Sequence, residues 1–515
     1  MTESYREGVL VKPYERLDQE QIRWLDEASL RVLDDPGIWC YNERAAKLFK
    51  THGARVWEEE SASPCWRVSL PAGLIREAVS RAPSRFVLGA RKRENRLLLD
   101  ADVPRVYFGS GSEANIWLEA DMEEFVSVSD GNKKKVRVPR FTEMRGTTAL
   151  LSRAARLCDK LEHLDFFIRP LNIQDPAITP ENHDVNKFFA SLNNTTKHVQ
   201  AGLTTLESLG SVVRMAELIA GGPEALRENP IISFIACVFK SPLQVVDDTA
   251  EKVFAIVEEG LPLVISSSPQ GGSSAPIQEA GMVAQINAEI LAGIALVQLI
   301  KEGAPVLYGS VPVRARLDDL HDLYGCPEFN QYNMDCVQLA RFYKIPCYST
   351  AGVGDAKVPG MQAVFEKLLT HLYMAMSGAQ YIHYALGLLD RTNSFCPLQA
   401  VLDNEQIGKI KHCLREPKMA PPVLEEMLKM VKKVMASPYR LFTRHVRKAL
   451  HAGDVSSPYR FETKGMEDRV LEKALDYLAE LEAMPSAHLE QAMVEQIFQE
   501  APGLLPEFGR PAQQG

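Results

Sequence analysis

The chain has 515 residues, of which 46% are hydrophobic and 24% are charged, and this composition excludes disordered, collagen-like and low-complexity proteins. Its 58 Lys and Arg residues against 67 Asp and Glu residues give a formal net charge of −9, which is a poor match to a nucleic-acid backbone. The length allows about three domains, or one large barrel with extensions.

The N-terminal segment and the cysteines indicate the cellular compartment of the protein. Residues 1–14 include Glu3, Arg6 and Glu7 and have no long apolar stretch, so we expect no secretory signal peptide and a cytoplasmic protein. The nine cysteines form no CxxC pair, so we expect reduced thiols and no structural zinc. Apolar runs such as Ile231–Phe239 are too short to cross a bilayer, so we expect no membrane partner.

The first hundred residues predict an N-terminal cap region of helices and strands, residues 1–103. A helix is expected over Asp18–Val32, and strands are expected at Phe86–Leu88 and Arg96–Leu99. The apolar stripe predicted for that helix consists of Ile22, Leu25, Ala28 and Val32.

From about residue 104, short apolar runs alternate eight times with longer amphipathic segments. Strands joined by crossover helices must run parallel, so the pattern predicts an α/β fold, a (β/α)8 TIM barrel over residues 104–416. The expected strands are Val106–Phe108, Leu164–Leu171, His198–Leu203, Ile231–Phe239, Leu261–Ser266, Ala304–Gly309, Pro346–Thr350 and Tyr381–Leu388. The expected helices are Thr142–Leu161, His183–Leu192, Leu206–Ala220, Val245–Glu259, Ala280–Glu302, Asn330–Tyr343, Met361–Met376 and Asp403–Leu414.

The first crossover contains an insertion, Glu113–Pro139. Ile116–Leu118 and Val136–Val138 flank the turn sequence Asp130–Asn132, which predicts a β-hairpin that we expect over the barrel mouth.

Residues 417–515 predict a C-terminal helical extension. Helices are expected over Pro421–Met435 and Gly465–Met484, followed by a frayed end at Pro502–Gly515.

The C-terminal ends of barrel strands carry the reacting groups in enzymes of this architecture. Here these ends offer few acids, which general acid–base catalysis would require, and many aromatic and hydroxyl residues. Such π faces can bind a quaternary ammonium ion, although rings can also simply fill the top of a barrel. The four candidate rings are Phe108, Tyr308, Tyr348 and Tyr384.

Other reactive residues are less informative. His198 and His383 are the histidines expected to face the barrel, either as ligand-binding groups or as hydrogen-bonded core residues. No HExxH motif occurs, so we expect no metal site. Lys357, in a polar loop after the seventh strand, and Lys197 are possible Schiff-base nucleophiles, but solvated or ion-paired lysines are favoured.

Four stretches together resemble the trimethylamine methyltransferase family, in particular its members that lack pyrrolysine and act on quaternary amines such as glycine betaine. These stretches are Ala82–Arg91, Ile286–Ser310, Gln338–Tyr343 and Ala351–Lys357. The resemblance implies a barrel enzyme that transfers a methyl group from its substrate to the Co(I) centre of a separate corrinoid protein. It implies that cobalamin is supplied by this partner and is not held by the chain itself.

The trimethylamine enzymes of this family carry pyrrolysine, whereas this sequence contains standard residues alone, so a quaternary amine is the expected substrate. For a betaine carboxylate, Arg314 and Arg316 are candidate donors, with His383 or His198, although both arginines have nearby aspartates as surface partners. The resemblance also implies a homo-oligomer. Two alternatives remain open: a non-catalytic barrel that binds a betaine-like cation, and a Schiff-base lyase that uses Lys357.

Overall fold

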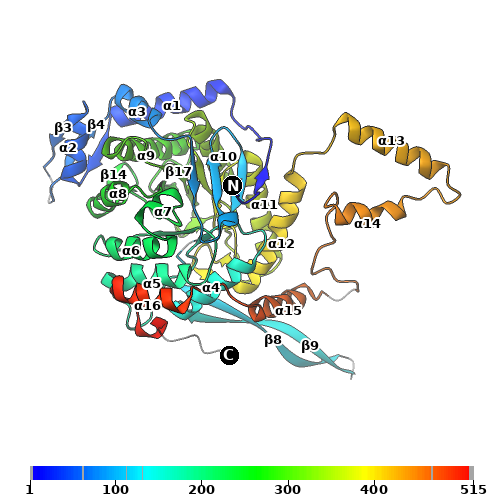
Figure 1. The fold of residues 1–515 in the computed structure, drawn as a ribbon. Helices are drawn as coiled ribbons and strands as arrows, with labels where there is room; N and C mark the ends of the chain where they lie inside the picture. Colours follow the sequence, from blue (N-terminus) through cyan, green and yellow to red (C-terminus); the bar gives the residue numbers. More distant parts are fainter. Residues whose placement is uncertain (1–3, 61–62, 112, 130–131, 466–467, 510–515) are drawn as a thin grey trace.

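A computed structural model describes residues 4–60, 63–111, 113–129, 132–465 and 468–509. At its centre lies a curled nine-stranded sheet (Figure 1). Eight of its strands are parallel, and the ninth, β1 (Val9–Leu10), pairs antiparallel with β7. In spatial order the parallel strands are β7 (Arg105–Phe108), β21 (Tyr381–His383), β20 (Cys347–Thr350), β17 (Val306–Ser310), β15 (Leu263–Ser267), β12 (Ile232–Ala236), β11 (Val199–Gly202) and β10 (Phe167–Ile168).

Each of the eight predicted apolar runs overlaps one of these parallel strands. From β10 to β21, each parallel strand lies beside its successor along the chain. The two ends of the ladder, β7 and β10, meet through one isolated parallel bridge between Gly109 and Phe166. Beside it, the backbone N–H of Asp165 donates to the carbonyl of Phe108 at 2.6 Å. A side chain on Gly109 would lie 1.8 Å from the Phe166 ring, so glycine is required where the strands approach.

The eight predicted helices also form, with shifted ends. The largest shifts are at the starts of the first helix, α4, and the last, α12, each six residues from the prediction. The start of α4 moves because Thr142 belongs to a strand and Thr147 caps the helix by accepting a hydrogen bond from the Leu150 N–H at 3.2 Å. A short helix, α7 (Pro223–Glu228), is additional. The eight are α4 (Thr148–Lys160), α5 (Pro180–Leu192), α6 (Leu209–Ala220), α8 (Asp247–Glu259), α9 (Glu279–Ile300), α10 (Pro327–Phe342), α11 (Met361–Ser377) and α12 (Pro397–Leu414).

Helix α9 is the most apolar of these elements. Its 22 residues are long and apolar enough to cross a membrane by length and composition alone, but 83% of its most hydrophobic window is buried inside the protein. It packs between β15 and β17 on one side and the N-terminal helices α1 (Gln19–Asp34) and α3 (Ala72–Ser80) on the other. This double burial explains why α9 lacks a polar face.

The N-terminal region consists of helices and two small sheets, and its helices lie at one end of the molecule together with β3 (Arg55–Glu58) and β4 (Trp66–Ser69) (Figure 1). One sheet joins its strands to β13 (Phe239–Lys240) and β14 (Gln244–Val245), which follow β12. The other is the predicted antiparallel pair β5 (Arg85–Leu88) and β6 (Leu97–Asp100). The remaining elements are β2 (Ile38–Cys40) and α2 (Glu43–Thr51).

The buried face of α1 is wider than the predicted stripe. Ile22 is buried and Leu25, Ala28 and Val32 are half-buried, and the polar residues Asp26 and Ser29 are buried as well. Their burial has a physical cause, because Asp26 accepts a hydrogen bond from the Tyr343 hydroxyl at 2.9 Å. Ser29 donates to the Ala284 carbonyl on α9 at 3.0 Å.

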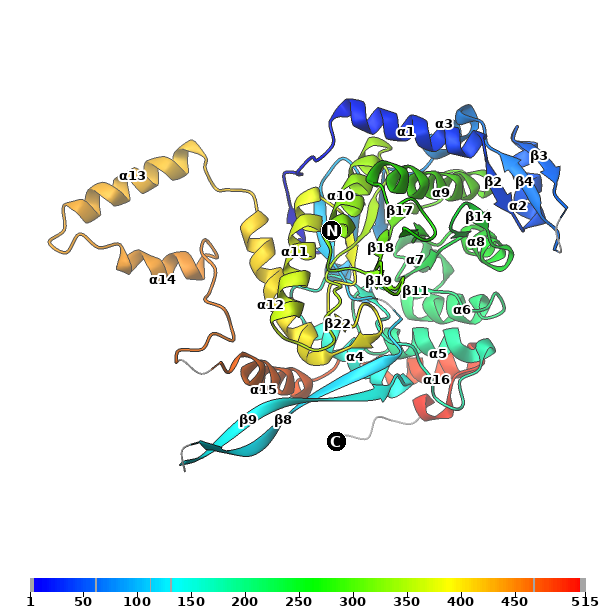
Figure 2. The same ribbon diagram turned by 180° about the vertical axis from the view of Figure 1, so that it is seen from behind.

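The predicted hairpin forms from β8 (Ile116–Ser129) and β9 (Asn132–Arg145) and is longer than expected. Asp130 and Gly131 of the predicted turn lie outside the described residues. The base of the hairpin pairs with β23 (Ser394–Phe395), but its outer part extends away from the body and does not cover the mouth (Figures 1 and 2). The exposed Phe125 and Val126 near its tip agree with that direction.

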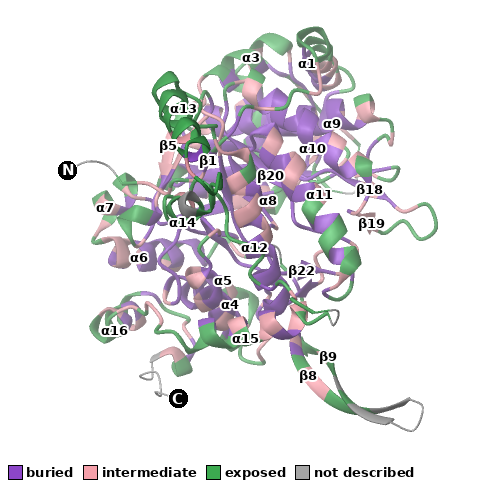
Figure 3. Ribbon diagram, turned by 90° about the vertical axis from the view of Figure 1, so that its right-hand side faces the viewer, coloured by how far each residue is buried: buried purple, intermediate pink, exposed green. Residues whose placement is uncertain are grey.

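The C-terminal extension leaves the body and returns to it. Helices α13 (Pro421–Met435) and α14 (Thr443–His451) stand away from the body and are exposed, whereas the sheet and its neighbouring helices are buried (Figures 2 and 3). Helices α15 (Val470–Ala483) and α16 (Gln491–Glu500) pack back against it. The predicted frayed end is wrong for Leu505, which is buried and whose N–H donates to Asn186 at 2.8 Å.

Candidate functional site

Alternate residues of the parallel strands face the inside of the curled sheet and form a buried cluster separate from the helix-packed core. Leu88, Leu97 and Leu99 of β5 and β6 join this cluster at the N-terminal end of the strands. The N-terminal end is therefore filled, and the C-terminal end is the candidate mouth. The strand residues of the cluster are Tyr107, Phe166, Ile168, Val264, Leu307, Tyr348 and Tyr381.

Five rings stack along the inner wall toward the mouth, and we call Phe166, Tyr381, Tyr348, His383 and Tyr384 the aromatic column. Phe166 and Tyr381 stack with centroids 3.6 Å apart, and Tyr348 lies 5.8 Å from Tyr381. Tyr348 stacks on His383 at 4.1 Å, and Tyr384 meets His383 edge-on at 3.8 Å. The column therefore brings together three of the predicted residues, Tyr348, His383 and Tyr384.

His383 is uncharged in this environment. Burial lowers the pKa of His383 well below its ordinary value, because no carboxylate lies near enough to compensate for the lost solvation. Its Nδ1 lies 3.1 Å from the Ser349 carbonyl, which accepts the ring N–H, and its Nε2 lies 3.4 Å from the Thr350 hydroxyl. A cation beside this ring therefore meets no imidazolium charge.

Tyr384 marks the outer end of the column. It is partly exposed and has a φ of 67°, a left-handed conformation that is uncommon for a non-glycine residue. Such backbone strain is concentrated at ligand-binding sites, where the surrounding packing holds it in place. Its ring packs against both the interior cluster and the cluster of Val313, Phe329 and Val353 at the rim.

The opposite wall of the mouth is polar. Cys237, just beyond β12, is reached by solvent, and burial by the surrounding protein raises the pKa of its thiol. The Ser266 hydroxyl is buried and has no hydrogen-bond partner among the described residues. The mouth thus combines a wall of π faces with a wall of small neutral polar groups.

A pair of opposite charges lies at the rim between β10 and β11. Arg169 is 3% exposed and is held by the carboxylate of Glu113, which is itself exposed, and by the side chain of Asn172. Burial lowers the pKa of Arg169, which Glu113 partly offsets, and its Nε has no partner in the described residues. Both line a pocket of about 440 Å³ that also includes Gly202.

A buried lysine supports this pocket from α5. The Lys187 ammonium donates to Asp184 at 2.5 Å and to the Gly202 carbonyl at 2.6 Å. Burial, together with the charge of Arg169, lowers the pKa of Lys187 to about 8. The charges of Lys187, Asp184 and the pair at the rim form one connected network.

Two of the four predicted rings lie elsewhere, and we correct those predictions. Phe108 packs in the helix layer, with its centroid 6.0 Å from that of His371 on α11. Tyr308 also points into that layer, where its hydroxyl donates to Asn287 on α9 at 2.9 Å. The reason is the two-residue period of a strand: the interior positions are taken by Tyr107 and Leu307, one residue earlier.

His198 faces the interior but lies far from the mouth, at the start of β11. Its Nδ1 lies 2.8 Å from the Gly89 carbonyl and its Nε2 lies 2.7 Å from the Ser233 hydroxyl. Burial lowers the pKa of His198 to about 4. Both ring nitrogens are used, so His198 is a hydrogen-bonded core residue rather than a substrate ligand.

The two predicted arginines are both held by acids. Arg316 is an exposed residue that pairs with Asp318 at 2.9 Å and Asp319 at 3.5 Å. Arg314 lies on β18 (Val313–Ala315), part of a small sheet at the rim, and pairs with Glu328 at 3.1 Å. Arg316 thus forms an ion pair at the surface, and Arg314 forms one at the rim.

The lysines do not support a Schiff-base site. Lys357 is exposed and lacks the desolvation that activates a lysine nucleophile. Lys197 is buried, contrary to the expectation of a solvated or ion-paired residue, and donates to the carbonyls of Cys158 at 2.6 Å and Leu161 at 2.8 Å. Burial lowers the pKa of Lys197 to about 7, but both carbonyls lie in the helix layer behind the sheet.

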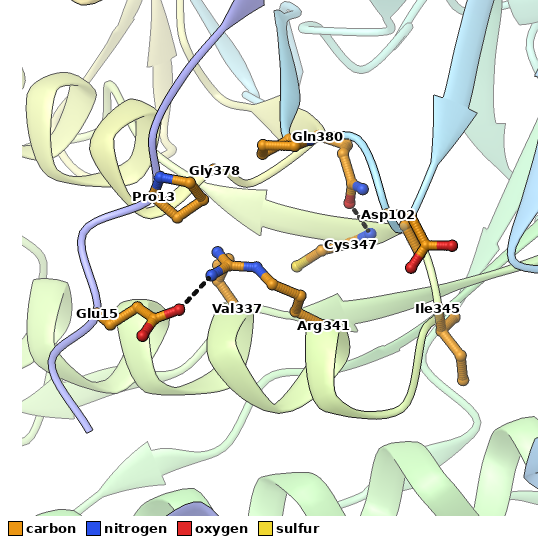
Figure 4. A pocket seen from close by; sticks show the side chains of 11 residues that line it. Pro13, Glu15, Asp102, Val337, Arg341, Ile345, Cys347, Gly378 and Gln380 are labelled. Carbon is orange, nitrogen blue, oxygen red and sulfur yellow. Dashed lines mark hydrogen bonds and ion pairs between the residues drawn. The ribbon is translucent and has the colours of Figure 1, made fainter. Parts of the chain in front are cut away.

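A second pocket, of about 240 Å³, lies at the end of the sheet opposite the mouth (Figure 4). Arg341 and Glu15 approach each other across it at 3.5 Å, and Cys347, the first residue of β20, lies at its inner side. Because the filled N-terminal end of the sheet separates it from the aromatic column, we exclude it from the candidate site.

Sequence reasoning missed Tyr381, Phe166, Cys237 and the pair at the rim. Arg169 and Tyr381 both lie in predicted strands, but strand prediction alone does not show which residues face inward. The pairing of Glu113 with Arg169 joins residues 56 positions apart and leaves no local pattern.

Comparison with known proteins adds independent evidence. The family model described as trimethylamine methyltransferase matches residues 6–425. The chain is 31% identical over 393 residues to a trimethylamine methyltransferase of Desulfitobacterium hafniense, covering 76% of this chain and 73% of the relative. It is 30% identical to one of Methanosarcina mazei, covering 79% and 77%. It is 26% identical to a glycine betaine methyltransferase of Desulfitobacterium hafniense, covering 82% of each.

Proposed function

The chain belongs to the trimethylamine methyltransferase family, and we propose that it demethylates a quaternary amine of the betaine type, with the reduced corrinoid of a separate protein as methyl acceptor. The family membership supports a methyltransferase acting on methylated amines. The likeness to a glycine betaine methyltransferase and the absence of pyrrolysine from the sequence support the betaine class.

The aromatic column is the observation that carries this proposal. Tyr384, the outermost ring of the column, is partly exposed and lies beside an uncharged His383, and a quaternary ammonium ion is attracted to the π face of such a ring by its quadrupole. Each contact of this kind contributes roughly 0.5–2 kcal/mol, depending on desolvation. Stacking fixes the rings in advance, so binding costs little side-chain entropy.

Methyl transfer from a quaternary nitrogen needs no acidic side chain among the stacked rings of the mouth. In the transfer, the bond from nitrogen to the methyl carbon breaks, and its electron pair stays on nitrogen to give a neutral tertiary amine. No proton moves, so no general acid is needed. The protein's part is to hold the substrate with one methyl group directed out of the mouth, toward the acceptor.

A betaine has two opposite charges, and the rim offers one of each. We assign its carboxylate to Arg169, in place of the earlier candidates Arg314 and Arg316, because the Arg169 Nε is buried and without a partner in the described residues. A carboxylate that binds Arg169 takes the place of Glu113, whose own charge then becomes available to the ammonium ion.

The same proposal includes a closed (β/α)8 barrel. It is supported by the strand order, in which the second to the eighth parallel strands each neighbour their successor, and by the isolated bridge from Gly109 to Phe166 between the first and the second. In this proposal the corrinoid protein docks at the open C-terminal end of the barrel. The cytoplasmic location of the chain stays a prediction.

The test is turnover with purified chain, a reduced corrinoid protein and a panel of quaternary amines. We expect the absorbance of the reduced corrinoid to fall as it is consumed. We also expect the demethylated amine to form. Tyr384→Leu should raise KM about tenfold by removing a π face, and Tyr384→Phe should leave it nearly unchanged. Ligand-induced stabilisation without any turnover would contradict the proposal and favour a non-catalytic binder.

Arg169 has a test of its own. Arg169→Lys should raise KM for glycine betaine about tenfold, because the bidentate fork is lost. For tetramethylammonium, which has no carboxylate, KM should change little. An equal effect on both amines would show that Arg169 does not bind the carboxylate.

The Schiff-base alternative has a separate test. Borohydride trapping with carbonyl substrates should fail, in keeping with the exposed Lys357.

A further inference from the structure

Residues 418–451, which we call the arm, leave the body after α12 and stand away from it with α13 and α14 (Figures 1 and 2). Val434 is the one buried residue in the described part of α13. Figure 3 shows both helices as exposed. Their surface includes an apolar stripe on α13 formed by Leu424, Met427, Leu428, Val431 and Met435, all exposed.

The base of the arm is closed. The Arg415 guanidinium donates to the carbonyls of Gly453 and Asp454, and the Lys418 ammonium pairs with the Asp454 carboxylate at 2.8 Å. The chain therefore leaves and re-enters the body at one point. This makes the arm a defined projection and not a linker between two distant places.

Helix α13 needs a partner to be stable. A helix of 15 residues is marginal in water by itself, and its stability in proteins comes mainly from burial of an apolar face. The stripe has the spacing i, i+3, i+4, i+7 and i+11, which places these side chains along one side of the helix. Contiguous exposed apolar surface of this kind marks an interface.

The order of charges on α13 suits a second copy of itself. Glu425 and Glu426 lie near its N-terminus, and Lys429, Lys432 and Lys433 lie toward its C-terminus. An antiparallel copy places the acids of one helix beside the bases of the other, whereas a parallel copy would place like charges together. Antiparallel pairing also sets the two helix dipoles in opposite directions, which is favourable.

The positive charge of the arm lies mostly outside the helix that makes the contact. The arm has eight Lys and Arg residues and two Glu residues, a net charge of +6, but the two Glu and three Lys residues of α13 nearly balance each other. Two α13 helices can therefore lie side by side without a large net repulsion.

The family model ends at residue 425, inside α13, so the arm lies mostly beyond the segment that this model matches.

We propose that the arm joins two copies of this chain, with α13 of one copy lying antiparallel to α13 of the other across a two-fold axis. The apolar stripes cover each other, and the acids of each helix pair with the lysines of its partner. This contact is isologous and closes at the dimer. It is independent of the reaction that the barrel performs.

Charge reversal tests the proposal on the full chain. The wild type should sediment as a dimer in the micromolar range. Glu425→Lys with Glu426→Lys should be monomeric, as should Lys432→Glu with Lys433→Glu, because each places like charges opposite each other. Mixed in equal amounts, the two variants should recover a dimer that contains one copy of each, since every contact then joins opposite charges.

The control is Asp476→Lys with Glu480→Lys on α15, which changes the net charge by the same amount at exposed positions outside the arm and should leave the dimer intact. Recovery in the mixture shows that both variants are folded. A monomeric wild type, or a dimer that both arm variants retain, overturns the proposal. So does a wild type that gains a partner only when a corrinoid protein is added.

Discussion

Three buried histidines, His198, His371 and His383, are held uncharged by the interior of the protein. Burial lowers the pKa of His198 to about 4 and that of His371 to about 3, and it lowers the pKa of His383 well below its ordinary value. Each ring lies within hydrogen-bond distance of a backbone carbonyl, and for His198 and His371 this bond offsets the lost solvation of the charged form only in part. These side chains make the folded state sensitive to acid.

The unfolded chain binds a proton at each of these rings below a pH of about 6.5, whereas folded His198 does so only near 4. Its contribution to the free energy of unfolding is therefore complete above about 6.5 and is lost as the pH falls through this window, by about 3 kcal/mol. Denaturant titrations across the window should show this loss, and His198→Asn should show a smaller one. An equal slope in the variant would contradict this assignment.

The sequence does not show which side chains of a predicted strand face the site. Tyr308 and Tyr348 both lie in correctly predicted strands, yet one ring packs against α9 and the other lies in the aromatic column. A strand with both faces buried has no alternation of polar and apolar residues, so its sequence does not show which residues point to which face of the sheet. His383 and Tyr384 were predictable from their place at a strand end, whereas Glu113 and Arg169 meet only through the fold.

At the scale of elements, a buried polar network attaches the N-terminal region to the sheet. Asn287 on α9 accepts a hydrogen bond from Tyr308 at 2.9 Å and donates to Ser29 on α1 at 2.8 Å and to Tyr343 at 3.0 Å. Asp26 receives the Tyr343 hydroxyl and pairs with Arg76 on α3 at 2.6 Å. One side chain of α9 thus links a strand and two helices.

Tyr308→Phe should lower the free energy of unfolding by about 1–3 kcal/mol, because the buried Asn287 oxygen loses its donor. Its kcat and KM for methyl transfer should stay at wild-type values, since the ring lies behind the sheet. Denaturant unfolding and steady-state kinetics measure the two effects. A large change in KM with unchanged stability would return Tyr308 to the substrate site.

The order and type of elements were largely predictable, because the alternation of short apolar runs and amphipathic segments repeats eight times. Helix α14 and helix α16 were not predicted. The direction of the β8–β9 hairpin was not predictable either, since it depends on the pairing of Phe395 on β23 with Trp117. Turn sequences indicate that a hairpin forms but not where it points.

At the scale of the whole molecule, the last helices fasten the chain back onto its middle. The Lys160 ammonium donates to the carbonyl of Leu481 on α15 at 2.8 Å, and Arg153 pairs with Glu482 at 2.6 Å. Ile497 on α16 is fully buried near α6. The last two helices, α15 and α16, therefore contribute to the core although the family model ends before them.

Ile497→Ala should lower the free energy of unfolding by about 2–5 kcal/mol, through lost burial and the cavity left behind. Gln496→Ala, at the neighbouring exposed position, is the matched control and should change it by less than about 0.5 kcal/mol. Urea unfolding of both variants provides the measurement. Equal stability of the two would mean that α16 is not docked in solution.

The three leucines of β5 and β6 that fill the N-terminal end of the sheet have a kinetic consequence for the proposed reaction. The closed barrel proposed above, filled at its base, would have a single entrance, and both reactants would need it. A bulky acceptor seated there traps whatever is inside, so the small amine must enter first and its demethylated product must leave last. Steady-state rates should then follow a compulsory order, and excess acceptor should inhibit by occupying the entrance of the empty enzyme.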